Sequence, residues 1–306
     1  MPNSTTAPIF VLGCQRSGTT LLCAVLNRHP ALFIENELPW DTYEHFDGGQ
    51  TDIDDLSAQL AAHLNLTQSP SWLATQHAAS PFGILELALR TRAGNLNKQS
   101  WGIKDPRLTY FLPQFLRAYP NSKAILLMRD ARATAASIIP MREHIANAYH
   151  AAKLWKREVN IQLDLAERYA TRILSVKYED FVLEPERHLE QICHFLNIPY
   201  HTNMLDESNV VPITESRGTV NITTPISTDK IDQWKNALNR RQLGIIEHVA
   251  GDRLRMLGYE PVCPGHRPGV VERLWYDLQQ SVMSNIWWQR RSRLRTLLGG
   301  RFALED

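Results

Sequence analysis

Residues 8–20 constrain the fold of this 306-residue chain more than any other stretch. Ile9–Leu12 is an unbroken apolar run, which is typical of a β-strand covered on both faces. Gly13–Thr20 follows with the G-x-x-x-x-G spacing of a phosphate-binding loop, and Leu21–Leu26 continues as a helix. A strand, a glycine turn and a helix N-terminus in this order direct backbone N–H groups at an anion. We therefore predict a phosphate-type site here; the alternative is an ordinary strand-to-helix turn.

The loop lacks the lysine that nucleoside triphosphatases place on the transferring phosphoryl group, because Thr19 stands at that position. Arg16 supplies a positive charge earlier in the loop instead. The hydroxyl donors of the loop are Ser17, Thr19 and Thr20. Asp105 and Asp130 are the only candidates for a metal-binding aspartate at a later strand end, and neither is unambiguous. The loop is therefore predicted to bind a polyanion without a metal.

Short apolar runs alternate with helical patterns along the rest of the chain. The further predicted strands are 32–34, 101–103, 123–128 and 173–176, and the predicted helices are 54–66, 82–96, 108–119, 131–139, 145–169, 185–196, 228–236, 240–256 and 271–298. This alternation favours parallel pairing through right-handed crossovers. We predict an α/β fold with a P-loop-type central parallel sheet flanked by helices on both faces. Ligands of such sheets bind at the carboxyl ends of the strands, where Arg16, Lys104 and Arg129 fall.

Composition limits the classes of protein that this chain can belong to. With 43% hydrophobic residues it can bury a large core, which we assign to one α/β domain over residues 1–265, with a helical extension over 266–306. The 33 basic and 32 acidic residues nearly cancel, so no global field favours nucleic acid. The four cysteines are scattered, and no apolar run approaches about 20 residues. These features predict a cytoplasmic protein.

Two motifs resemble those of the sulfotransferases that use 3′-phosphoadenosine 5′-phosphosulfate (PAPS). The first is Gln15-Arg16-Ser17-Gly18-Thr19-Thr20, and the second is the strand 126–128 running into Arg129-Asp130-Ala131-Arg132, with Ser137 after it. Lys104-Asp105-Pro106 and Glu37 are similar to the branch that includes tyrosylprotein sulfotransferases and many bacterial relatives. Weaker similarity continues through Tyr178-Glu179-Asp180 and Trp234 to Gly258-Tyr259. The resemblance therefore covers about four-fifths of the chain, residues 8–259.

The resemblance implies catalytic roles for three charged residues. Glu37 would be the general base that takes the proton of the acceptor hydroxyl, with Glu35 as the competing position and His45 as a more distant one. Arg16 and Lys104 would contact the sulfonate and the bridging oxygen, where negative charge grows. Lys104 could instead form a plain salt bridge with Asp105.

The resemblance also implies a binding site for the nucleotide. The residues assigned to the cofactor are Arg16, Ser17, Gly18, Thr19 and Thr20 of the loop, Arg129 and Ser137 for the 3′-phosphate, and Tyr178 and Arg217 for the adenosine or its phosphate. Arg132 is a weaker candidate that could instead face solvent, and Trp234 is predicted to lie in the core.

We therefore predict an enzyme, a sulfotransferase that moves the sulfonate of PAPS onto a tyrosyl, sugar or small-molecule hydroxyl, leaving the product PAP. The sequence does not settle the acceptor, and residues 41–100 are expected to shape its pocket. One alternative is a P-loop kinase using ATP and Mg²⁺. Another is a non-catalytic nucleotide-binding protein at a membrane surface, suggested by the tryptophans and arginines of 271–298. That helix could equally pack on the body or on a second copy of the chain.

Overall fold

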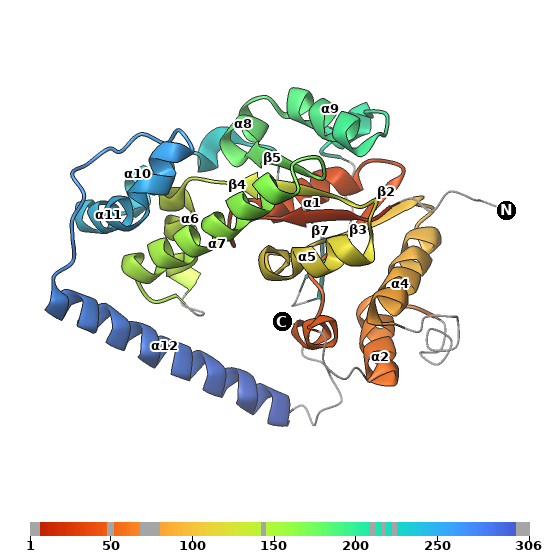
Figure 1. The fold of residues 1–306 in the computed structure, drawn as a ribbon, viewed down its shortest axis with the longest axis horizontal. Coiled ribbons are helices and arrows are strands. Elements are labelled where there is room, and N and C mark those ends of the chain that lie inside the picture. Colours follow the sequence, from red (N-terminus) through yellow and green to blue (C-terminus); the bar gives the residue numbers. More distant parts are fainter. Residues whose placement is uncertain are drawn as a thin grey trace.

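A computed structural model describes residues 7–47, 52–67, 80–141, 145–208, 212–215, 218–221 and 225–297, with the backbone alone for 212–221 and 286–297 (Figure 1). Its centre is a five-stranded sheet in the order β2-β3-β1-β4-β5, and all neighbouring strands are parallel. The strands are β1 (Ile9–Leu12), β2 (Leu32–Asn36), β3 (Ser100–Lys104), β4 (Lys123–Met128) and β5 (Ile173–Lys177). The predicted α/β fold with a parallel sheet is confirmed.

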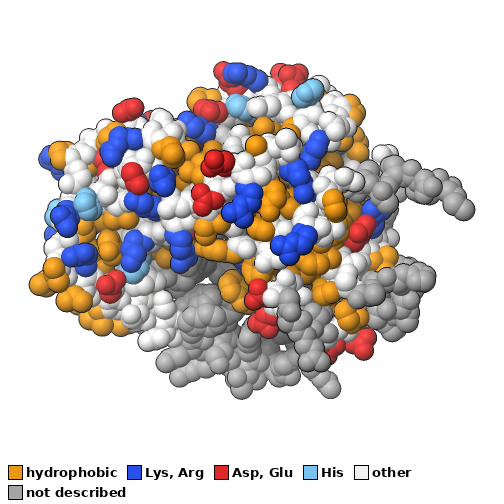
Figure 2. Space-filling view, viewed as in Figure 1, with side chains coloured by type: hydrophobic (Ala, Val, Ile, Leu, Met, Phe, Trp, Pro, Cys, Tyr) orange, Lys and Arg blue, Asp and Glu red, His pale blue; other side chains and the backbone are white. Residues whose placement is uncertain are grey.

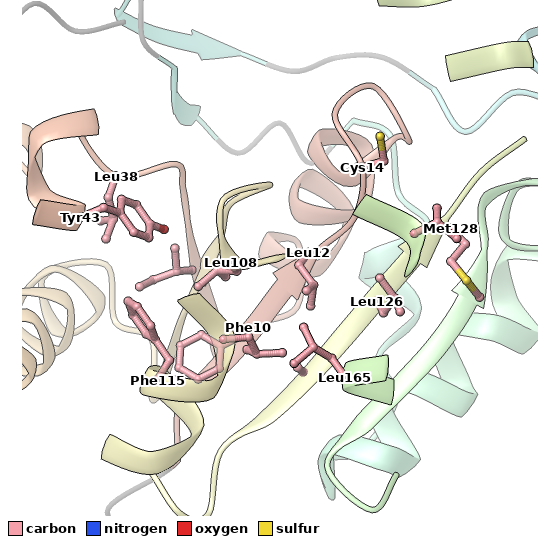
Figure 3. Packing of buried hydrophobic residues seen from close by; sticks show 14 of the residues in the cluster. Phe10, Leu12, Cys14, Leu38, Tyr43, Leu108, Phe115, Leu126, Met128 and Leu165 are labelled. Carbon is pink, nitrogen blue, oxygen red and sulfur yellow. The ribbon is translucent and has the colours of Figure 1, made fainter. Parts of the chain in front are cut away.

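Helices cover both faces of the sheet because alternate strand residues point to opposite sides. Ile9 and Val11 pack with the helices α1 (Thr19–Asn27), α8 (Tyr178–Leu183) and α9 (Pro185–Leu196). Phe10 and Leu12 point the other way, toward residues such as Phe115 (Figure 3). The helices on that side are α5 (Leu108–Ala118), α6 (Ala131–Ile138), α7 (Ala148–Arg168) and α11 (Arg240–Met256), together with α2 (Ile53–His63) and α4 (Pro81–Asn95). The strand ends are thereby fixed in a rigid frame.

Several boundaries differ from the predictions for physical reasons. Helix α7 begins at Ala148 because the Asn147 side chain accepts a hydrogen bond from the His150 backbone N–H and so caps the helix. The single helix predicted over 228–236 is wrong: a short 3₁₀ helix, η4 (Thr228–Lys230), and a one-turn α-helix, α10 (Trp234–Ala237), replace it. An antiparallel pair that the predicted strands do not include is formed by β6 (Pro212–Glu215) and β7 (Gly218–Asn221). Three further 3₁₀ helices are η1 (Trp40–Phe46), η2 (Ile139–Met141) and η3 (Thr202–Met204).

The last described helix, α12 (Val270–Leu297), runs along the lower edge of the molecule in Figure 1. It meets the body where Tyr276 stacks on Tyr149 of α7 and where Glu272 accepts hydrogen bonds from Arg241 of α11. A row of large apolar side chains stays more than half exposed: Val271, Leu274, Trp275, Leu278 and Val282. Contact of this row with a membrane or a second copy stays a prediction, as does the domain boundary at 265.

On the face shown in Figure 2, basic and acidic side chains are interspersed, in keeping with their nearly equal numbers. Within the described part of the chain, no helix combines the length and the apolar character needed to cross a bilayer.

Candidate active site

The loop after β1 forms a tight turn against the neighbouring strand. A Cβ atom on Gly13 would lie 2.4 Å from the Leu127 carbonyl oxygen, so only glycine fits there. The Ser17 hydroxyl is buried and donates to the Cys14 carbonyl oxygen at 2.6 Å, which closes the turn. Gly18 follows with a φ of 94°, and α1 begins at the next residue. The N-terminal N–H groups of α1 therefore lie in the loop, where the predicted anion would bind.

Arg16 connects the loop to helix α6. Its backbone is in the left-handed region with a φ of 67°, which is uncommon for a residue other than glycine. Its side chain is exposed, and Nε donates to the Ser137 hydroxyl at 3.2 Å. The structure thus joins two residues that are 121 positions apart and that the sequence assigned to one ligand.

Arg129, the first residue after β4, lies between the loop and α8. It donates to the Arg16 carbonyl oxygen at 3.2 Å, and its guanidinium carbon lies 4.2 Å from the centre of the Tyr178 ring. The same ring packs so closely on Gly18 that a Cβ there would approach it to 2.4 Å. Burial lowers the pKa of Arg129, although Tyr178 and Glu179 oppose that effect. The buried Nε of Arg129 donates to no described residue, which leaves one donor of this cation for a ligand.

Lys104 and Glu37 form an ion pair at the end of β3. The Lys104 Nζ lies 2.6 Å from Glu37 Oε1, with the lysine side chain 1% exposed and the glutamate side chain 40% exposed. Glu37 is held by its own backbone as well, since its N–H donates to the Lys104 carbonyl oxygen at 2.7 Å and its φ is 61°. Asp105 pairs with Arg107 at 2.7 Å instead, so a salt bridge between Lys104 and Asp105 is not what the structure contains.

The two other candidates for the general base have different partners. Glu35 is buried in β2, where Oε1 lies 3.3 Å from the imidazole of His63. His45 lies in η1, 3.6 Å from Asp55 of α2. Of the three candidates, only Glu37 contacts Lys104 in an ion pair among the described residues.

Arg132 and Trp234 have structural roles. The alternative that Arg132 faces solvent is wrong, because it is 4% exposed and pairs with Asp130 at 2.6 Å and with Glu247 at 2.8 Å. Its guanidinium also covers the ring of Trp234, which is buried as predicted. This network fastens α6 to α11 immediately after Arg129 and so fixes the backbone that presents Arg129.

A pocket of about 330 Å³ opens beside the loop. Residues from the loop, η1, α5 and α7 line it: Gln15, Trp40, Tyr43, Glu44, Asp47, Pro106, Arg107, Tyr110, Phe111, Leu154, Arg157 and Glu158. Two residues of the lining, Trp40 and Pro106, follow Glu37 and Lys104 in the chain by three and two positions. Tyr43, Glu44 and Asp47 are the lining residues that come from 41–100, and the expectation that this region shapes the acceptor pocket stays a prediction.

The structure brings nearly all predicted site residues to one edge of the sheet. Ser17 and Thr19 are buried, whereas Thr20 is half-buried at the start of α1. Arg217 lies outside the described residues. The sequence analysis did not single out three residues of the pocket lining, Arg107, Tyr110 and Glu158. No motif marks them, and the apolar spacing of their segments predicts only helices that pack on the core. Among the described residues no cluster of three histidine, cysteine or acidic side chains is arranged for a metal, and the absence of a metal stays a prediction.

Comparisons with known proteins agree with this geometry. Residues 8–202 match the profile of the sulfotransferase family. A putative protein-tyrosine sulfotransferase of Caenorhabditis briggsae is 28% identical over 270 residues, covering 82% of this chain and 89% of the relative. Protein-tyrosine sulfotransferase A of Caenorhabditis elegans is 26% identical over 277 residues, covering 85% and 69%. The sulfotransferase domain from the curacin biosynthetic pathway has a similar fold, with a TM-score of 0.63 and 21% identity over 85% of this chain and 100% of that one.

Proposed function

This chain belongs to the sulfotransferase family, and from that premise we propose that it transfers the sulfonate group of PAPS to the hydroxyl group of an acceptor, with Glu37 as general base. The observation on which the proposal rests is the ion pair between Lys104 and Glu37 at the same sheet edge as Arg16 and Arg129. A carboxylate and three cations therefore follow the carboxyl ends of neighbouring parallel strands. That arrangement suits transfer between two oxygens.

The residues at this edge fit PAPS. The buried, unpartnered Nε of Arg129 is a donor that a phosphate oxygen would satisfy. Ser137 accepts a hydrogen bond from Arg16 and would contact the same phosphate group. The N-terminus of α1 and the hydroxyls of Thr19 and Thr20 would hold the 5′-phosphate. The Tyr178 ring is 2% exposed between Arg129 and Gly18, so it would support the cation and the loop that hold the nucleotide rather than stack on the adenosine. When bound, PAPS supplies the sulfonate, and its sulfur–oxygen bond breaks as the acceptor oxygen bonds to sulfur.

Glu37 and Lys104 have the two remaining roles, proton transfer and charge stabilisation. The carboxylate of Glu37 takes the hydroxyl proton of the acceptor, and its Oε2 atom accepts it, because Oε1 is engaged by Lys104. The ammonium of Lys104 is fixed and almost fully buried, so it can stabilise negative charge without reorganising. The Arg16 side chain is exposed on the solvent side of the loop, where it would orient the sulfonate group.

Thermal shift assays separate this function from a kinase. We expect PAP to raise the melting temperature without Mg²⁺, and ATP with Mg²⁺ to have little effect, because the loop has Thr19 in place of the kinase lysine. Labelled PAPS should then transfer its label to a phenol or alcohol. Stabilisation by ATP with Mg²⁺ alone would contradict the proposal and favour a P-loop kinase.

A further inference from the structure

Glu158 is a buried carboxyl group in the wall of the pocket that the proposed chemistry does not use. It lies on α7, is 3% exposed, and accepts a hydrogen bond at Oε1 from the Tyr110 hydroxyl at 3.0 Å. Its second oxygen, Oε2, is buried and receives no well-formed hydrogen bond, although the Cys14 thiol and the Gln15 backbone lie near enough to affect its pKa. A buried acceptor without a donor is costly unless a ligand supplies one.

The charges around the pocket favour a cation as that ligand. Arg107 lines the pocket, but its charge is balanced by buried Asp105 at 2.7 Å. The other charged residues of the lining are three acids and one arginine, namely Glu44, Asp47, Glu158 and Arg157. No described basic side chain lies within ion-pair distance of Glu158. Burial raises the pKa of Glu158, and hydrogen bonds from Cys14 and Tyr110 together with the charge of Arg157 offset only part of this effect. A cationic ligand would offset the remaining cost of desolvation.

The rest of the lining is aromatic or apolar. Trp40, Tyr43, Phe111 and Leu154 surround the space, which has the volume of a small substituted ring. The single guanidinium group of Arg107 already lies over the rings of Tyr43, at 4.3 Å, and Trp40, at 5.2 Å, which shows that these rings accept a cation. An acceptor that fits would combine an apolar ring with a positively charged end.

We propose that the acceptor is a hydroxyl compound carrying an ammonium group on an aromatic or apolar frame, and that Glu158 receives this ammonium group. The inference rests on the proposed sulfonate transfer and narrows its substrate class. Glu158 and Leu154 line the pocket from α7, so the charged end of the acceptor would lie at α7 and its hydroxyl would have to reach Glu37.

Three phenols of similar size test the proposal on the unmodified protein. Tyramine carries a cation, 4-ethylphenol is neutral, and 3-(4-hydroxyphenyl)propanoate carries an anion. A hydrogen bond to a charged group contributes enough for at least about a tenfold higher kcat/KM for tyramine than for 4-ethylphenol, with the propanoate lowest. An equal rate for all three, or a preference for the propanoate, would overturn the inference.

A variant then assigns the selectivity to one residue. Glu158→Gln keeps the side-chain shape and an oxygen for Tyr110, and it should reduce the ratio of kcat/KM between tyramine and 4-ethylphenol to near one. Glu167→Gln, at an exposed position of the same helix, is the matched control and should leave the ratio as it is. A ratio that survives in Glu158→Gln assigns the selectivity elsewhere and refutes the role of Glu158.

Binding of PAP, measured first, keeps the two proposals apart. Failure of PAP to stabilise the protein removes the proposed function itself. Stabilisation by PAP without preferential turnover of tyramine removes only the substrate class.

Discussion

Replacing Glu37 with glutamine should abolish most turnover and leave nucleotide binding intact. Glutamine keeps an oxygen that can accept the hydrogen bond from Lys104, now 2.6 Å from Oε1, but it cannot take a proton. General base catalysis typically contributes about 10²–10⁴-fold. We therefore expect kcat to fall by that factor, which corresponds to about 2.7–5.5 kcal/mol of transition-state stabilisation.

The same substitution should change stability little. The Lys104 end of the ion pair is 1% exposed but keeps an oxygen acceptor in Glu37→Gln, and the glutamate end is 40% exposed and screened by water, so we expect a loss of about 1 kcal/mol. For a chain of this length, that predicts a fall in melting temperature of about 4 °C or less. The assay is kcat at saturating PAPS, with the dissociation constant of PAP measured by calorimetry on the same preparation.

Glu35→Gln is the matched control, because it makes the same chemical change two residues earlier. Its carboxylate is buried against His63 and does not contact Lys104, so we expect a loss of stability with kcat reduced far less than in Glu37→Gln. A collapse of kcat in Glu35→Gln alone would move the base to Glu35. Equal losses of PAP affinity and kcat in Glu37→Gln would make Glu37 a structural residue.

Three further outcomes follow from the contacts. Arg129→Ala should weaken PAP binding by about tenfold or more in calorimetry, since a buried donor to phosphate is lost, and unchanged affinity would contradict its assignment. Glu247→Gln should lower the free energy of unfolding in urea by about 2–3 kcal/mol, because it weakens the buried bond to Arg132, while PAP affinity changes less. Hydrogen bonds from Tyr276, His266 and Arg241 outweigh the effect of burial and lower the pKa of Glu272 to about 2, so the stability it contributes is present above its unfolded pKa near 4.5 and is lost as the pH falls toward 2. The stability difference between the wild type and Glu272→Gln in urea should therefore shrink between pH 5 and pH 3, and a constant difference would refute the linkage.

The sheet and its functional edge could be predicted because the signals are local. Charged residues mark the carboxyl ends of several strands, since β3 ends in Lys104 and β4 is followed at once by Arg129. Parallel pairing then forces those charged residues to one edge, whatever the helices do. The loop motif added its own geometry, since only glycine fits at Gly13.

The partners of the charged residues could not be predicted, because they depend on packing between distant segments. Neighbours in sequence suggested Lys104 with Asp105, yet Asp105 turns to Arg107, and Lys104 meets a residue 67 positions earlier. Arg132 was wrongly allowed to face solvent because its acidic partner Glu247 lies 115 positions away on α11. The apolar pattern over 228–236 predicted one helix, but the chain there forms two separate short helices, η4 and α10.

Two of the proposed site residues have strained backbone, so the proposed function would compete with stability at these positions. Arg16 and Glu37 both have a positive φ, 67° and 61°, in the region that costs a residue with a Cβ about 1–2 kcal/mol. At an ordinary loop position, replacing alanine with glycine destabilises a protein by about 0.4–1 kcal/mol. At Arg16 the sign should reverse: Arg16→Gly should be more stable than Arg16→Ala by about 1 kcal/mol in urea unfolding, while both lose the bond to Ser137 and bind PAP equally weakly. If alanine is the more stable of the two, the left-handed turn is not what selects the loop conformation, and the anion site depends on its ligand for its shape.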